Sequence, residues 1–196
     1  MIFQTLQYYI VKKLLLFLLL LIGSNLIAQE QNNVSKFWSA LEKHCGKAYE
    51  GVITEGATDD FKGKQLIMHV ISCKQGEIKI PFHVGENRSR TWVLTNKANA
   101  ITLKHDHRHE DGSEDKVTQY GGTSTNSGSA NMQIFPADEE TVKIIPAAFG
   151  NVWWISVDEN SFTYNLRRIG TDRLFTVKFD LTKPVDLPPS PWGWKK

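Results

Sequence analysis

The sequence lacks an apolar run long enough to cross a membrane as a helix. Its longest unbroken apolar stretch, Leu14 to Ile22, is well short of the about 20 residues that a spanning helix needs. Lys12 and Lys13 precede this stretch, and small or polar residues follow it through Ala28, which is the pattern of a secretory signal peptide. No cysteine follows closely, so a lipid anchor of the bacterial lipoprotein kind is not expected. We predict cleavage after Ala28, an exported protein that is periplasmic or secreted, and no transmembrane segment after cleavage; the alternative is an uncleaved N-terminal anchor.

A surplus of positive charge is also missing once this segment is removed. Lys12 and Lys13 are its only charged residues, which leaves 23 − 2 = 21 basic against 21 acidic side chains. A formally neutral chain gives no electrostatic argument for nucleic acid, and we expect no such partner. The nucleophile motif Gly-x-Ser-x-Gly is absent, Gly121-Gly122 matches no phosphate loop, and residues 111–115 lack the spacing of an EF-hand.

Cysteine is scarce, and both cysteines of the chain, Cys45 and Cys73, lie after the signal segment. An even number of cysteines in an exported chain favours a disulfide. The rival interpretation is a metal site, but the spacing of the two residues fits no zinc template. We therefore predict a disulfide between Cys45 and Cys73.

Long helical segments are missing too. Only residues 36–44 place apolar side chains at helical spacing, with Ser35 available as an N-cap. The period then changes to two, and Pro81 indicates a sheet edge or a bulge. Strands are expected at residues 47–55, 65–74, 77–84, 90–95, 100–109, 117–120, 132–135, 141–145, 152–157, 161–169 and 173–181. This pattern excludes a doubly wound α/β fold and predicts an all-β, mainly antiparallel barrel or sandwich of about eight to ten strands.

The mature length of 196 − 28 = 168 residues suits one domain with one core. We divide the chain into a signal peptide at 1–28, a disordered polar leader at 29–35, a β-barrel domain at 36–183 and a Pro-rich, extended tail at 184–196.

The densest chemical signal is the tract His-Asp-His-Arg-His-Glu-Asp at residues 105–111. Histidine is the side chain that most readily binds metal or moves protons near neutral pH. By the period-two rule, His105, His107 and His109 continue the apolar face of Ile101 and Leu103, which we expect to point inward.

Alternate residues of a strand are about 6.6–6.8 Å apart, so His105 and His107 can share one metal ion, whereas His109 is displaced by a further step. Another strand must supply the remaining ligands. His69 is the better candidate, because His83 faces away from the apolar side of its strand. Three interpretations stay open: a metal or catalytic site, a polar ligand pocket, and histidines that are structural or face solvent.

Aromatic and basic side chains provide the other candidates. Trp92 and Tyr164, with further strand aromatics, either line a cavity or pack an ordinary core. Arg167, Arg168 and Arg173 bracket the last expected hairpin, where they either hold an anionic ligand or are solvated turn charges.

Several segments carry a resemblance to known proteins. Residues 46–51 (GKAYEG), 90–95 (RTWVLT), 104–112 (KHDHRHEDG), 120–122 (YGG) and the stretch from FDLTKPV at 179–185 to Pro191-Trp192-Gly193 resemble a family of uncharacterised exported bacterial proteins. One short helix before a strand meander is similar to calycins, the lipocalin-like barrels, which implies a lipocalin-like β-barrel. Some calycin relatives bind haem through a barrel histidine, but no haem motif matches here, and we do not expect haem.

Three hypotheses of function follow. The first is an exported β-barrel that binds a small molecule, with His105, His107 and His109 as the polar end of the pocket and Trp92 and Tyr164 as walls. The second is a metalloprotein or enzyme that uses His105, His107 and His69 with a transition metal. The third is a cell-envelope interaction module without small-molecule chemistry. The sequence does not indicate an oligomeric state.

Overall fold

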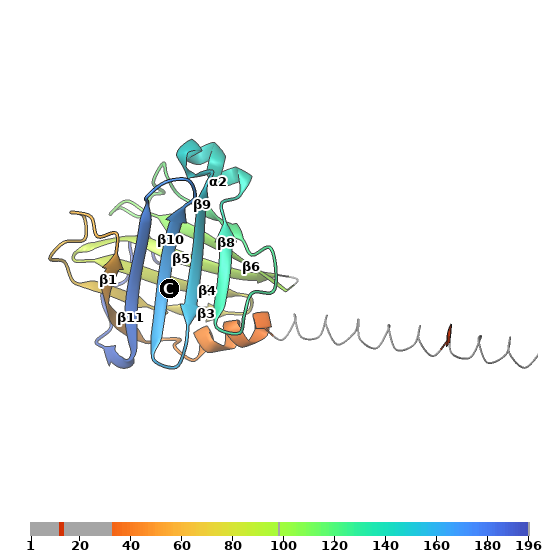
Figure 1. The fold of residues 1–196 in the computed structure, drawn as a ribbon. Coiled ribbons are helices and arrows are strands. Elements are labelled where there is room, and N and C mark those ends of the chain that lie inside the picture. The colour runs from red at the N-terminus through yellow and green to blue at the C-terminus, as the bar shows by residue number, and fades with distance from the viewer. Residues whose placement is uncertain (1–11, 14–32, 98, 196) are drawn as a thin grey trace, which may run out of the picture.

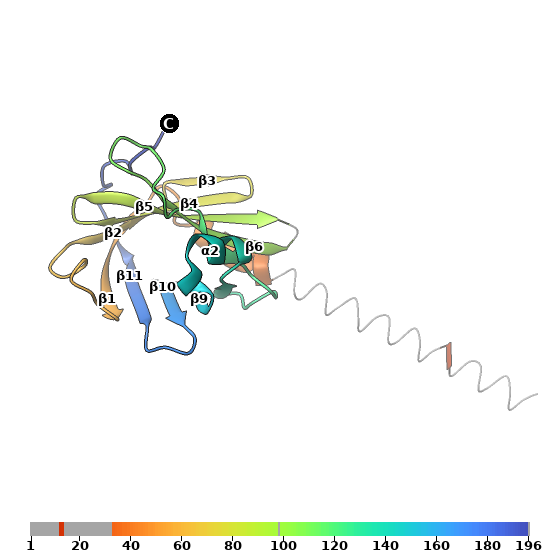
Figure 2. The same cartoon turned by 90° about the horizontal axis from the view of Figure 1, so that it is seen from above.

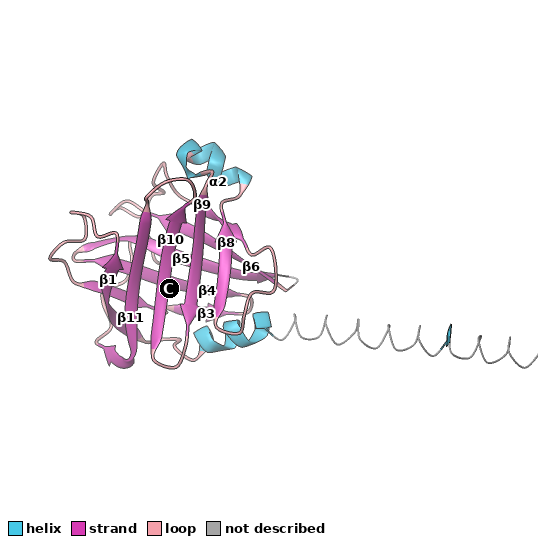
Figure 3. Cartoon of the chain, in the orientation of Figure 1, coloured by secondary structure: helices cyan, strands magenta, loops and turns pink. Residues whose placement is uncertain are grey.

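The computed structural model describes residues 12–13, 33–97 and 99–195, so the expected signal peptide lies outside the described residues apart from Lys12 and Lys13. Among the described residues, eleven strands form one antiparallel sheet. Figures 1 and 3 show how this sheet curls into a nearly closed barrel. Within the described ranges, no helix is both long and apolar enough to cross a membrane. The expected all-β, antiparallel class is confirmed, and the barrel is compatible with a calycin-like fold.

The sheet follows the order β7-β6-β5-β4-β2-β1-β11-β10-β9-β8, and β3 pairs with β4 beside β2. The elements are β1 (Ala48–Glu55), β2 (Leu66–His69), β3 (Ser72–Lys74), β4 (Glu77–Val84), β5 (Asn87–Lys97), β6 (Ala100–His107), β7 (Tyr120–Thr123), β8 (Met132–Pro136), α2 (Glu139–Ile144), the 3-10 turn η1 (Pro146–Ala148), β9 (Asn151–Val157), β10 (Ser161–Arg168) and β11 (Leu174–Val185).

A helix over residues 33–42 closes one end of the barrel. Figure 1 shows it in orange at the end away from α2. Val34, Phe37, Trp38 and Leu41 are buried and belong to the same apolar core as the strands. The helix therefore includes residues 33–35, which we had placed in the disordered leader, because burial of Val34 ties that turn to the core.

The expected strand at 65–74 is broken into β2 and β3. Val70 leaves the ladder, since its N–H donates to the Lys47 carbonyl and its carbonyl accepts from the Gly46 N–H, at 3.0 and 2.7 Å. Pro81 of β4 lies opposite this break, between the residues that pair with β2 and those that pair with β3. Proline, which has no backbone N–H, is tolerated at this position because neither β2 nor β3 pairs with it there.

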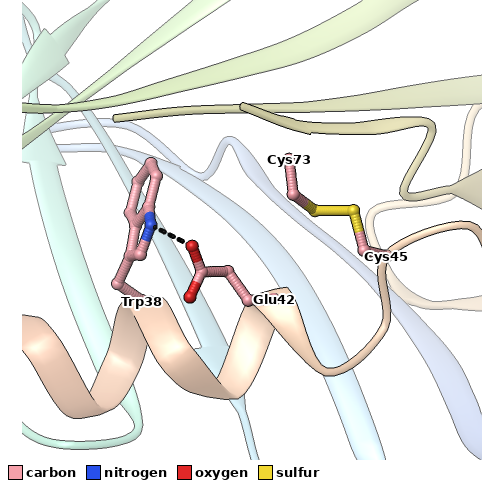
Figure 4. Close-up of a disulfide and its surroundings, with 4 residues drawn as sticks. All are labelled: Trp38, Glu42, Cys45 and Cys73. Atoms are coloured by element: carbon pink, nitrogen blue, oxygen red, sulfur yellow. Dashed lines mark hydrogen bonds between the residues drawn. A yellow bond between two sulfur atoms is a disulfide. The ribbon is translucent and has the colours of Figure 1, made fainter. Parts of the chain in front are cut away.

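A disulfide joins Cys45, just after the helix, to Cys73 of β3, as predicted (Figure 4). One turn earlier in the helix, the Trp38 indole N–H donates to the Glu42 carboxylate at 2.9 Å. The disulfide thus fixes the helix that closes the barrel to the sheet beside it.

We expect the variant Cys45→Ser/Cys73→Ser to lose about 3 kcal/mol of unfolding free energy. The two cysteines are separated by 28 positions, and a cross-link over a loop of this length restricts the unfolded chain by about that amount. Urea unfolding of the variant and of the oxidised wild-type protein measures the difference, with reduced wild-type protein as the matched control. A loss below about 1 kcal/mol contradicts this role.

The barrel closes between its end strands, β7 and β8, without a regular ladder. The Thr141 hydroxyl, which is fully buried, donates to the Gly121 carbonyl at 2.8 Å and accepts from the Gly121 N–H at 2.6 Å. The Asp138 N–H also donates to the Gly121 carbonyl, at 3.1 Å. At Gly122, a Cβ would come within 1.8 Å of the Pro136 carbonyl oxygen, so only glycine permits this approach.

Two expectations near the junction between β7 and β8 were wrong. Residues 141–145, expected as a strand, lie mainly in α2, because Asp138 caps its N-terminus and Glu139 and Glu140 fill its first turn. The strand expected at 117–120 begins only at Tyr120 and runs on to Thr123, three residues beyond its expected end.

The segment after β11 crosses the outside of the barrel. β11 runs to Val185, four residues beyond the expected end of the strand at 181 and two beyond the expected end of the barrel domain at 183. The Trp192 N–H donates to the Arg88 carbonyl at 3.1 Å, and the Arg88 guanidinium donates to the Ser190 carbonyl at 3.0 Å. Figure 2 shows this end of the chain beside β5, on the outer face of the sheet.

Candidate functional site

A cavity of about 620 Å³ lies at the barrel end that the N-terminal helix does not close. The inward side chains of β5, β6, β9, β10 and β11 form its walls, and the loop after β1 forms part of its rim. Its lining comprises Gly56, Thr58, Asp60, Phe61, Phe82, Arg90, Thr91, Trp92, His105, His107, Tyr120, Ile145, Asn151, Trp153, Tyr164, Leu166, Arg168, Arg173, Leu174 and Phe175.

Stacked aromatic rings make the apolar wall. Trp92 and Tyr164 stack with centroids 4.5 Å apart, and Phe82 stacks on Trp92 at 5.0 Å. Trp92 and Tyr164 are almost fully buried, at 3% and 7% exposed. Both predicted wall residues therefore belong to the apolar core and also line the cavity. The two interpretations of these aromatics, core packing and cavity lining, are both correct for this pair.

His105 is buried at the floor of the cavity and both of its ring nitrogens have partners. Nδ1 lies 3.0 Å from the Tyr120 carbonyl oxygen and Nε2 lies 2.7 Å from the Tyr164 hydroxyl. A carbonyl can only accept, so neutral His105 carries its proton on Nδ1, and Nε2 accepts from Tyr164. Burial lowers the pKa of His105 to about 3, which keeps the ring neutral.

His107 lies one step nearer the mouth and is half-buried. Its Nε2 is 3.1 Å from the Tyr120 hydroxyl, and the Tyr120 ring stacks on His105 at 4.5 Å. Burial lowers the pKa of His107, and the nearby Arg90 lowers it further. Burial also raises the pKa of Tyr120 to about 12, so Tyr120 is a neutral hydroxyl at the cavity wall.

The structure does not extend this histidine row to His109. β6 ends at His107, and the chain turns there, since the His109 N–H donates to the Ser113 carbonyl and its carbonyl accepts from the Gly112 N–H, both at 2.9 Å. His109 is exposed and does not line the cavity. The inward row predicted from the sequence is therefore shortened to His105 and His107.

His69 is not brought to His105 and His107 either. On β2 it alternates with Leu66 and Met68, which face the core, so its side chain lies on the outer face of the sheet. His83 alternates with Phe82 and Val84 in the same way. Across residues 12–13, 33–97 and 99–195, no group of three or more His, Cys, Asp or Glu side chains is placed to hold a metal ion.

Three arginines stand around the cavity: Arg90, Arg168 and Arg173. Arg168 and Arg173 were predicted from the sequence as candidates. The third candidate, Arg167, is exposed and does not line the cavity. Sequence reasoning missed Arg90, together with Tyr120 and Asn151. A signal was available for Arg90, since it lies two positions before Trp92 and shares its face.

The fold and this cavity define a β-barrel that is closed at one end by a helix and open at the other into an aromatic pocket with a polar floor. No protein-family model, curated protein or solved structure matches the chain. The resemblance to a family of exported proteins therefore stays a prediction, and the assignment of function rests on the geometry of the pocket.

Proposed function

We propose that this protein is an exported binding protein that holds a small molecule inside its β-barrel. The observation that carries the proposal is the cavity of about 620 Å³, because sites for small ligands are commonly concave, about 300–1,000 Å³ in volume, mostly apolar and furnished with a few placed polar groups. The Trp92–Tyr164 wall supplies the apolar surface, and His107 and Tyr120 supply the polar groups.

The hydrogen bonds of His105 support binding over metal chemistry. Both ring nitrogens are engaged, so a metal ion at Nε2 would have to displace the Tyr164 hydroxyl and leave that buried group without its partner. His105 then serves the site by fixing Tyr164 and Tyr120 in place. Export is supported by the signal-like N-terminus and by the disulfide between Cys45 and Cys73.

The test uses the neutral fluorescent probe N-phenyl-1-naphthylamine with the full chain. Leu166 lines the cavity and is 8% exposed, so Leu166→Trp places a large ring in the volume that the probe needs. We expect saturable binding to the wild-type protein and at least about tenfold weaker binding to Leu166→Trp, which corresponds to about 1.4 kcal/mol.

Ile134→Trp is the matched control, because Ile134 is 38% exposed and does not line the cavity. It adds the same ring outside the site and should leave the dissociation constant unchanged. Thermal unfolding of both variants shows that each is folded. Equal binding by the two folded variants, or no binding by the wild-type protein, overturns the proposed function.

A further inference from the structure

We propose that the ligand is an organic anion, whose carboxylate, sulfonate or phosphate group is held by Arg90, Arg168 and Arg173 while its apolar body lies on the Trp92–Tyr164 wall. This inference rests on the proposed function and adds the charge of the ligand to it.

Strand geometry carries all three guanidinium groups to the inner face of the barrel. Each arginine is two positions from an inward-facing residue of its own strand or strand end, and residues two apart on a strand share a face. The pairs are Arg90 with Trp92, Arg168 with Leu166, and Arg173 with Phe175. The inner faces of β5, β10 and β11 thus each carry an arginine in or beside the strand near the open mouth.

Neutral partners orient two of these arginines. The Arg90 guanidinium donates to the Asn87 side-chain carbonyl at 3.1 Å, and the Arg168 Nε donates to that of Asn151 at 2.8 Å. An amide oxygen positions a guanidinium without cancelling its charge. Among the described residues, none of the three cavity arginines forms an ion pair.

Arg108, outside the cavity, shows the contrast. It is paired with the Asp106 and Glu114 carboxylates, each at 2.9 Å. After removal of the signal segment the chain has as many acidic as basic side chains. A shortage of carboxylates therefore does not explain why the cavity arginines lack the ion pairs that Arg108 forms. The cavity arginines keep their positive charge for a group that enters from outside.

The charges within the lining are unbalanced. Among the described residues of the lining, Asp60 is the one carboxylate, against three guanidinium groups. Their charges act on the cavity wall: burial raises the pKa of Tyr120, Arg90 and Arg173 both lower it, and the Asp115 carboxylate outside the lining makes a smaller contribution that raises it. A planar guanidinium matches the geometry of carboxylate, sulfonate and phosphate oxygens, and such charged hydrogen bonds are stronger where water is partly excluded.

Two probes that differ only in a sulfonate isolate this charge. We expect 8-anilinonaphthalene-1-sulfonate to bind the full chain at least about tenfold more tightly than N-phenyl-1-naphthylamine, a ratio typical of one added charged hydrogen bond. Arg173→Gln and Arg168→Gln should each reduce this ratio, and the double variant should reduce it further, since it leaves only Arg90 of the three arginines. Because the ratio compares the two probes in the same variant, any change in the cavity that weakens both probes alike cancels.

Arg167→Gln is the matched control, since Arg167 is exposed on the same hairpin and does not line the cavity. It should leave the ratio as in the wild-type protein. Arg173 is itself exposed, so Arg173→Gln tests the inference even where Arg168→Gln lowers stability. Thermal unfolding reports the folding of each variant.

The outcomes separate the two proposals. Suppose that the neutral probe binds and that Leu166→Trp blocks it. If the sulfonate then gives no advantage, or its advantage is undiminished in the double variant, the anion inference is overturned and the proposed function stands. If Arg167→Gln lowers the ratio as much as Arg173→Gln, the effect is one of general surface charge and the inference is again overturned. If neither probe binds, both proposals fail.

Discussion

Acid should destabilise this protein by several kcal/mol between pH 6.5 and pH 4, largely through buried histidines. Burial lowers the pKa of His105 to about 3 and, with Arg88 adding to it, lowers that of His83 to about 4, whereas an unfolded chain binds these protons near pH 6.5. Above pH 6.5 both states are neutral and nothing is lost. As the pH falls, only the unfolded state gains the protons, and each histidine costs about 1.4 kcal/mol per pH unit down to its folded pKa.

The loss should total on the order of 5 kcal/mol at pH 4, which is comparable with the whole stability of a typical domain. Urea unfolding at pH 7, 5.5 and 4 measures it. His105→Gln keeps a donor for the Tyr120 carbonyl and an acceptor for the Tyr164 hydroxyl but does not titrate, so its stability should fall less steeply with pH than that of the wild-type protein. His109→Gln removes an exposed histidine and should behave as the wild-type protein. Identical slopes for the two variants contradict the assignment.

Period-two alternation was enough to predict the β-rich architecture. Strands such as β4, β9 and β10 begin and end within one residue of the predicted ranges, because each has a regularly alternating face to bury. The break between β2 and β3 was not visible, since it depends on bonds between Val70 and the turn at Gly46, which tertiary structure alone supplies. The helical turn α2 was missed although Asp138 and the two glutamates after it form an N-terminal signal.

The candidate site was predicted in part: residues at regular strand positions were placed correctly, whereas features that depend on strand ends or on long-range contacts were not. Trp92, Tyr164, His105 and His107 are regular strand residues, so alternation places them on the inner face correctly. His109 fails because alternation stops where β6 ends, and strand ends depend on pairing rather than on the residue pattern. The hydrogen bond between His105 and Tyr164 joins positions 59 apart in sequence, so no local pattern could reveal that the histidine is already satisfied.

Closure of the barrel should depend on the absence of a side chain at Gly122. Its backbone does not need the left-handed conformation, but a Cβ there would lie 1.8 Å from the Pro136 carbonyl oxygen. Because the obstacle is backbone, it cannot move aside as the end of a flexible side chain can. We expect Gly122→Ala to part β7 from β8 and to lower the unfolding free energy by about 4 kcal/mol, at the upper end of overpacking effects.

Gly170→Asn is the control for Gly122→Ala. Gly170 has a φ of 78°, which asparagine tolerates, and among the described residues nothing lies within 4 Å of where its Cβ would be. Its change should cost only a few tenths of a kcal/mol, as is usual for surface substitutions. Thermal unfolding distinguishes the two, since about 4 kcal/mol corresponds to a fall in Tm of about 10 °C for a domain of this size.

Because Tyr120 begins β7 and stacks on His105, Gly122→Ala should also weaken binding of N-phenyl-1-naphthylamine, whereas Gly170→Asn should not. A Gly122→Ala protein as stable as Gly170→Asn would show that the barrel does not need this close approach to shape its pocket.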